Sequence, residues 1–255
     1  SKEFDQYRER FAHFFETIGE LGFAAELFME WKETCGDQDL PGKRRALEGA
    51  WRVLWREGDR EKARKIFEEL TPLCGVSEDG RCRVRYLLYK FAMLQDEEKF
   101  DEAEEVIREA KEISEKADDK FHLVMVYGNE GSLWKEKGDL EKARGSYEEQ
   151  EKISREIGDV LNEINSLIGK AGILLKEISR EGLRVALPST SLSELLFKIA
   201  SKKEGLDTEG LDAEEKQKIF DEAMRFCDRG KALSDKIGSP EKSQKICSLH
   251  GYLLR

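Results

Sequence analysis

The chain has 255 residues, of which 38% are charged and only four are proline, and its formal net charge is −10. The abundance of charge and the scarcity of proline suit long solvated helices. The net negative charge argues against a general binder of nucleic acid or of membrane surfaces, because both targets are themselves anionic. No apolar run approaches the roughly 20 residues that a membrane span needs, and Ser1 begins no secretory signal, so we expect a cytoplasmic protein.

Amphipathic runs separated by short turn sequences predict helices along nearly the whole chain. Glycine after a helix end adopts the left-handed conformation at little cost, and an aspartate that follows it can cap the next helix. Such turns read Glu57-Gly58-Asp59 and Lys137-Gly138-Asp139, and the corresponding turn between them reads Glu97-Glu98-Lys99. The expected helices, in chain order, span 3–18, 21–34, 42–57, 60–73, 82–97, 100–117, 120–137, 140–157, 160–178, 215–237 and 241–254.

One alanine recurs through these helices, at intervals of 39, 40, 40 and 80 residues: Ala24, Ala63, Ala103, Ala143 and Ala223. A second column lies about twelve residues earlier, and it reads Ala12, Trp51, Phe91, Gly131, Gly172 and Gly251. Three residues after each member of the second column comes a large residue: Phe15, Leu54, Leu94, Trp134, Leu175 and Leu254. Four residues after each alanine of the first column come Phe28, Phe67, Ile107, Tyr147 and Cys227. Spacings of three and four place side chains on one helix face, so we expect helix pairs in which Trp134 is buried. Self-similarity at this period indicates a helical solenoid.

The fourth unit is the clearest copy, with Gly131, Trp134, the turn Gly138-Asp139, Ala143 and Tyr147. This pattern resembles the tetratricopeptide repeat (TPR), and the period of about 40 is similar to the long-helix subclass found in cell-polarity adaptors, kinesin light chain and bacterial signal-transduction ATPase sensors. The resemblance implies an all-α fold: a right-handed α-solenoid of about five TPR-like helix pairs plus a terminal half-repeat or cap helix, forming a single domain over 1–255. Bulky residues at two positions of the small-residue column depart from the pattern and imply wider helix crossings there.

Two parts of the chain leave alternatives open. Gly172 and Ala223 are 51 residues apart, whereas Gly131 and Ala143 are 12 apart, so 180–214 is either an insertion, which we favour, or a degenerate repeat pair. An apolar stripe in this segment, Leu192, Leu195, Leu196 and Ile199, predicts a short helix at about 190–203. The last helix, 241–254, is either a cap helix or a truncated repeat, and its apolar end favours truncation of a larger protein.

Few residues suggest chemistry. The five cysteines are odd in number and without close pairs in the sequence, so we expect no disulfide framework, and we interpret the stretch between Cys74 and Cys82 as an ordinary loop rather than a redox switch. His13, His122 and His250 lie on different helices and are expected at the surface or at interfaces, so we predict no metal site. Nucleotide-binding glycine loops are missing, and no nucleophile, base and orienting group can be assembled. We therefore predict no cofactor and no enzyme activity.

Charge is unevenly distributed, because Lys43 to Ile66 holds nine basic and four acidic residues, a local charge of +5. The TPR resemblance implies that the first helix of each pair lines a concave groove, and arginine beside aromatic rings suits carboxylates or phosphates. The alternative is that these arginines pair with Glu48 and with neighbouring helices. The predicted partner-binding residues are Arg45, Arg52, Trp55, Arg56, Arg85, Tyr89, Asn129, Lys135 and Lys170.

Two classes of function follow. The first is a protein-interaction scaffold or adaptor that binds a peptide or protein segment, expected to be acidic, in its groove. The alternative is a ligand-sensing or regulatory segment of a larger signalling ATPase or effector that contacts nucleic acid. Nucleic acid is disfavoured by the acidic chain, and the lysine and asparagine clamp of TPR proteins that bind chaperone tails is not reproduced, since only Asn129 falls in a suitable column.

Overall fold

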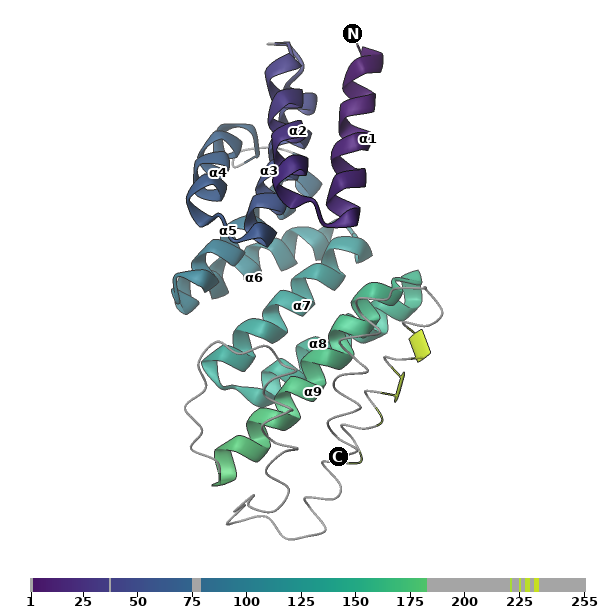
Figure 1. The fold of residues 1–255 in the computed structure, drawn as a ribbon. Coiled ribbons are helices and arrows are strands. Elements are labelled where there is room, and N and C mark those ends of the chain that lie inside the picture. The colour runs from purple at the N-terminus through teal and green to yellow at the C-terminus, as the bar shows by residue number, and fades with distance from the viewer. Residues whose placement is uncertain are drawn as a thin grey trace. The chain divides into compact units, whose positions relative to one another are not determined.

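The computed structural model describes residues 2–36, 38–74 and 79–182, together with residues 221, 225, 228, 229, 232 and 233. These residues are helical and include no strand, which confirms the predicted all-α class. The helices are α1 (Lys2–Ile18), α2 (Leu21–Thr34), α3 (Leu40–Glu57), α4 (Arg60–Cys74), α5 (Gly80–Asp96), α6 (Phe100–Lys116), α7 (Lys120–Lys137), α8 (Leu140–Ile157) and α9 (Val160–Gly182) (Figure 1). None of them is long and apolar enough to span a membrane.

The predicted ends agree with the structure to within a few residues, and the largest difference is at α9. This helix continues to Gly182, so the segment predicted to begin at residue 180 begins after it. Several predictions concern residues that the structure does not describe, apart from residues 180–182 and a few isolated positions. They are the predictions for the segment 180–214, for the helices at 190–203 and 215–237, and for the helix at 241–254.

The turns explain why the helices begin and end where they do. Gly58, Gly138 and Gly158 close their helices with positive φ values of 94°, 83° and 72°. The aspartate after each glycine then caps the next helix, and the backbone N–H of Lys142 donates to Asp139 Oδ1 at 3.1 Å. This confirms the predicted glycine and aspartate turns. The turn before α6 differs, because Glu98 carries the positive φ of 57° and Lys99 supplies no side-chain cap.

The chain divides into two compact units, residues 1–93 and 94–255. In the first unit α1 packs on α2, α2 on α3, and α3 on α4. In the second unit α6 packs on α7, α7 on α8, and α8 on α9, while α7 also contacts α9. Consecutive helices therefore pack in sequence order within each unit.

The alanine column forms the centre of the packing. Ala24, Ala63, Ala103 and Ala143 are all 0% exposed, as expected for small residues where helices cross closely. Tyr147, four positions after Ala143, packs so closely on the neighbouring helices that only glycine fits opposite its ring. A Cβ on Gly131 or Gly169 would come within 2.8 Å or 2.4 Å of the Tyr147 ring, so the α8 tyrosine lies against glycines of both α7 and α9.

Trp134 corrects one detail of the predicted core. It packs against the cluster of Leu140, Ala143, Tyr147 and Ile173, but it is only partly buried. The ammonium groups of Lys142 and Lys137 lie 4.0 Å and 5.4 Å from the ring centroid. Its outer side is therefore covered by lysine side chains, which place their apolar stems on the ring and keep their charges in water.

Candidate functional site

Six of the nine predicted binding residues belong to the first unit, where three aromatic rings form a stack. Trp51 lies between Trp55 and Tyr89, with centroid distances of 5.0 Å and 4.2 Å and interplanar angles of 11° and 28°. The guanidinium of Arg60 covers Trp55 at 3.9 Å from the ring centroid. Trp51 was not among the predicted binding residues, and it is buried at the centre of the stack.

The four predicted arginines each have a carboxylate partner inside this unit. Arg52 donates from both Nε and Nη2 to Glu16, at 2.8 Å and 2.6 Å, and Arg56 contacts the same carboxylate at 3.0 Å. The other two ion pairs are Arg45 with Glu9, at 3.7 Å, and Arg85 with Glu48, at 3.2 Å. These contacts follow the alternative in which the arginines pair with Glu48 and with neighbouring helices.

Glu16 on α1 is the centre of this charge network. Burial raises the pKa of Glu16, but the hydrogen bonds and charges of Arg52 and His13 lower it by more, to about 2. The carboxylate is therefore ionised at neutral pH and forms ion pairs with two of the predicted groove arginines, Arg52 and Arg56. An acidic partner at this surface has to compete with Glu16 for them.

The second unit holds an open cavity of about 490 Å³ between α7, α8 and α9. Side-chain amides and glycines dominate its lining, and the lining residues are Met125, Gly128, Asn129, Lys135, Tyr147, Gln150, Asn162, Asn165, Ile168, Gly169 and Gly172. Two predicted binding residues, Asn129 and Lys135, are among them. Lys170 is not: it is buried and forms an ion pair with Glu151.

Gln150 is the residue of this cavity that the sequence did not indicate. It is 3% exposed, and its Oε1 is buried without a hydrogen-bond partner among the described residues. A Cβ on Gly128 would lie 2.4 Å from Gln150 Nε2, so glycine at that position of α7 leaves the room that the amide occupies. A buried carbonyl oxygen without a donor is costly, so this group is suited to accept a hydrogen bond from a ligand.

Lys135 supplies the positive charge at the cavity. Burial lowers its pKa, and the nearby charges act in opposite directions, Glu136 raising it and Lys176 lowering it. Its ammonium forms no ion pair with the described residues, whereas Lys176 is held by Glu136 at 3.2 Å and by the Lys135 carbonyl at 2.8 Å. The cavity therefore combines an acceptor from Gln150, the amide of Asn129 and one cation.

Two buried carboxylates, Glu151 of α8 and Glu163 of α9, join these two helices through ion pairs. Glu151 and Glu163 are each contacted by Arg155, and Arg229 reaches Glu151 at 2.8 Å and Glu163 at 2.5 Å. Lys170 completes the pairing of Glu151. The sequence placed Lys170 in a groove, but here it neutralises a buried acid, so its position is explained by packing.

His122 and the cysteines make contacts that the sequence did not indicate. Of the two positions expected for the histidines, surface and interface, burial excludes the surface for His122, whose Nδ1 lies 2.9 Å from Oδ2 of the helix-capping Asp119. Cys74 and Cys82 form no close pair in the sequence, but their sulfurs lie 2.8 Å apart in the structure. Together with Glu48, these two thiols bring three potential metal-ligand atoms within 4.8 Å of one another in the described part of the chain.

Comparison with known proteins concerns the fold alone. No protein-family model matches the chain, and no curated protein matches it either. The described residues define an all-α protein whose consecutive helices pack in sequence order. Solved structures with a similar fold include the crystal structure of BtubC (BKLC) from P. vanneervenii, at a TM-score of 0.52 and 12% identity, over 90% of this chain and 88% of that chain. At this identity the likeness concerns the fold alone.

Proposed function

We propose that this chain is a protein-interaction module, a TPR-like α-solenoid that binds a peptide segment through the cavity between α7, α8 and α9. The observation that carries the proposal is the buried and unpartnered carbonyl of Gln150 at that cavity. The α-solenoid itself is supported by sequence-order packing and by the buried alanine column. A right-handed superhelix and an adaptor role in the cytoplasm belong to the same proposal.

The chemistry of the cavity suits a peptide backbone. A peptide offers one N–H donor and one C=O acceptor at each residue, and the pair of Gln150 and Asn129 offers the complementary groups. Two of the lining glycines make room for side chains of the cavity, since a Cβ on Gly128 would meet the Gln150 amide and a Cβ on Gly169 would meet the Tyr147 ring. Lys135 adds a site for a carboxylate, either an acidic side chain or a chain end.

The arginine surface of the first unit is the weaker candidate for the same role. To bind an acidic partner, each arginine of this surface would have to give up an ion pair with a carboxylate of its own chain and form one with a carboxylate of the partner. These arginines are Arg45, Arg52, Arg56 and Arg85. Such an exchange gains little net free energy, because a contact is lost for each contact made. We therefore assign the peptide to the cavity first and keep the arginine surface as an extension for acidic residues.

A displayed library of random twelve-residue peptides, selected on the immobilised chain, tests the proposal. The selected peptide is labelled and its affinity is measured by fluorescence anisotropy. Loss of a hydrogen bond to a charged or buried group is worth about 1.5–3 kcal/mol, so Asn129→Ala with Lys135→Ala should weaken binding by tenfold or more. Lys152→Ala, at an exposed position of α8, is the matched control and should leave binding unchanged.

Two results would count against the cavity. Normal binding by the Asn129→Ala, Lys135→Ala double variant rejects it outright. Weakened binding by Arg52→Glu with Arg56→Glu, without any effect of the cavity variants, moves the site to the first unit. Circular dichroism must show unchanged helicity in every variant for either comparison to hold.

The alternative, a ligand-sensing segment of a signalling ATPase or effector, is favoured by one observation. A volume of about 490 Å³ lies within the range of about 300–1,000 Å³ that small-molecule sites occupy. A thermal-shift screen with amino acids and mononucleotides separates the two functions. A stabilisation by a small anion that Lys135→Ala abolishes would favour sensing over peptide binding.

A further inference from the structure

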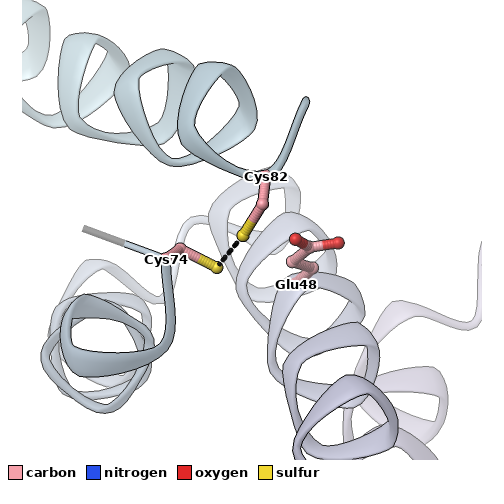
Figure 2. A group of neighbouring side chains, drawn as sticks. All are labelled: Glu48, Cys74 and Cys82. Atoms are coloured by element: carbon pink, nitrogen blue, oxygen red, sulfur yellow. Dashed lines mark hydrogen bonds between the residues drawn. The ribbon is translucent and has the colours of Figure 1, made fainter. Parts of the chain in front are cut away.

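Two buried thiols face each other where α4 ends and α5 begins. Cys74 is the last residue of α4 and Cys82 lies in the first turn of α5. They are 1% and 0% exposed, and their side chains point toward one another with the sulfurs 2.8 Å apart (Figure 2). A disulfide bond needs about 2.05 Å between sulfurs, so little movement separates this pair from a covalent bond.

Charged groups from three elements surround the pair. Glu48 of α3 lies beside both sulfurs, as Figure 2 shows. Arg44, one turn earlier on α3, lies 3.8 Å from Glu48 and 3.4 Å from Asp79, and Arg85 of α5 lies 3.2 Å from Glu48. The Nε of Arg44 is buried and makes no hydrogen bond with the described residues. A thiolate at this site would therefore lie next to a guanidinium whose Nε has no hydrogen-bond partner among the described residues.

Burial and nearby charges act on the Cys74 thiol. Burial raises the pKa of this thiol far above its usual range, and the neighbouring Cys82 and Glu48 raise it further. Arg44 acts in the opposite direction, because its positive charge lowers the pKa of Cys74. Burial lowers the pKa of Arg44 itself, but the neighbouring Cys82 and Glu48 raise it by more.

A metal ion fits this group less well than a disulfide. Two thiolates bound to tetrahedral zinc at about 2.3 Å lie roughly 3.8 Å apart, which is wider than this pair. Glu48 would be the third ligand, but Arg44 and Arg85 already contact its carboxylate. Two guanidinium groups would also repel a divalent cation at short range.

We propose that Cys74 and Cys82 are a redox pair, which a hydroperoxide converts into a disulfide and which a thiol reductant restores. One of the two thiols loses its proton and attacks one peroxide oxygen, the O–O bond breaks, and this cysteine becomes a sulfenic acid while the leaving hydroxide takes up the released proton as water. The sulfur of the other cysteine then attacks the sulfenic sulfur, and the sulfenic hydroxyl leaves as water with the proton of the second thiol. In total two thiols and one hydrogen peroxide give one disulfide and two waters.

The test treats the whole native chain with hydrogen peroxide, blocks the remaining thiols and digests the protein with trypsin. Cleavage after Lys65, Arg81 and Arg83 leaves the two cysteines on separate peptides, Ile66–Arg81 and Cys82–Arg83. Mass spectrometry should find them linked, two hydrogen atoms lighter than their sum, and dithiothreitol should separate them. Cys35→Ser is the matched control, because Cys35 is another buried cysteine, and the variant should still form the link.

Charge variants distinguish an activated pair from accidental proximity. Arg44→Gln should slow the link by about tenfold, and Glu48→Gln should accelerate it, because Arg44 favours a negative charge on the Cys74 sulfur and Glu48 opposes it. A merely loosened structure would expose the thiols and accelerate both variants. Acceleration of both, absence of the linked peptides, or a zinc ion bound by the reduced protein and lost in Cys74→Ser would each overturn the proposal.

Discussion

Tyr147 shows how single residues control the packing of this chain. It follows the buried Ala143 by four positions, and its ring lies against Gly131 of α7 and Gly169 of α9. Phe28 repeats the arrangement in the first unit, where a Cβ on Gly49 would come within 2.4 Å of its ring. Gly49 and Gly169 are 120 residues apart, which is three periods of 40, whereas the positions between them at this period are Tyr89 and Asn129. The arrangement therefore occurs in two units and is not repeated in every one.

The glycine opposite Tyr147 predicts an unusual cost for an alanine in a helix. Gly169→Ala should destabilise the protein by about 1–3 kcal/mol, because the new methyl overlaps the ring and forces the core to shift. Gly145 lies at an exposed position of α8, and a Cβ there would meet no atom within 4 Å. Gly145→Ala should therefore stabilise the protein by about 0.5–1 kcal/mol. Urea unfolding measures both, and a stabilising Gly169→Ala would contradict the packing described for Tyr147.

Glu16 predicts a pH dependence in the acid range. Its pKa in the folded protein is about 2, below the ordinary value of 4.5, so its contribution to stability is present above pH 4.5 and is lost as the pH falls toward 2. The difference in melting temperature between the protein and Glu16→Gln should therefore shrink between pH 5 and about pH 2.5. Removing the partner in Arg52→Met should largely abolish that pH-dependent difference. An equal difference across this range would show that Glu16 is not paired.

The turn between α5 and α6 departs from the turns that combine glycine with aspartate. Gly58, Gly138 and Gly158 carry positive φ and are followed by capping aspartates, but here Glu98 carries the positive φ and Lys99 gives no cap. An L-residue with a Cβ is disfavoured in that conformation, and an uncapped helix leaves backbone N–H groups to water.

Restoring the common turn should stabilise the element. Glu98→Gly with Lys99→Asp should raise the free energy of unfolding by about 1–2 kcal/mol, since an aspartate cap is typically worth about 1 kcal/mol. The reverse change, Asp139→Ala, should cost a similar amount by removing the cap of α8. Thermal denaturation followed by circular dichroism measures all three proteins. An unchanged free energy of unfolding in the double variant would mean that the ion pair between Lys99 and Glu97 already stabilises this turn by a similar amount.

For the whole molecule, the proposed solenoid makes a prediction about shape. Far-UV circular dichroism should show a helix-dominated protein with almost no sheet, and small-angle scattering should give an elongated, curved particle. The reason is that each repeat of a solenoid contacts only its neighbours, so the array grows in one direction. A spherical scattering profile would contradict the solenoid while leaving the all-α class intact.

The sequence by itself determined the helices, their turns and the buried alanine column. These features depend on local chemistry and on spacings of three and four, which act within one helix or one turn. It also pointed to Asn129 and Lys135, which line the cavity of the second unit. It could not show that Lys170 serves a buried acid, because its partner Glu151 lies on another helix.

Only the tertiary structure decided which groups meet. The pairing of Arg52 and Arg56 with Glu16 crosses from α3 to α1, and the Gln150 amide fits against α7 because a glycine there leaves room for it. Cys74 and Cys82 are eight residues apart in the sequence, but the packing of α4, α5 and α3 decides that their sulfurs touch beside Glu48. Local patterns set the elements, whereas contacts between elements depend on the packing of side chains from distant parts of the chain.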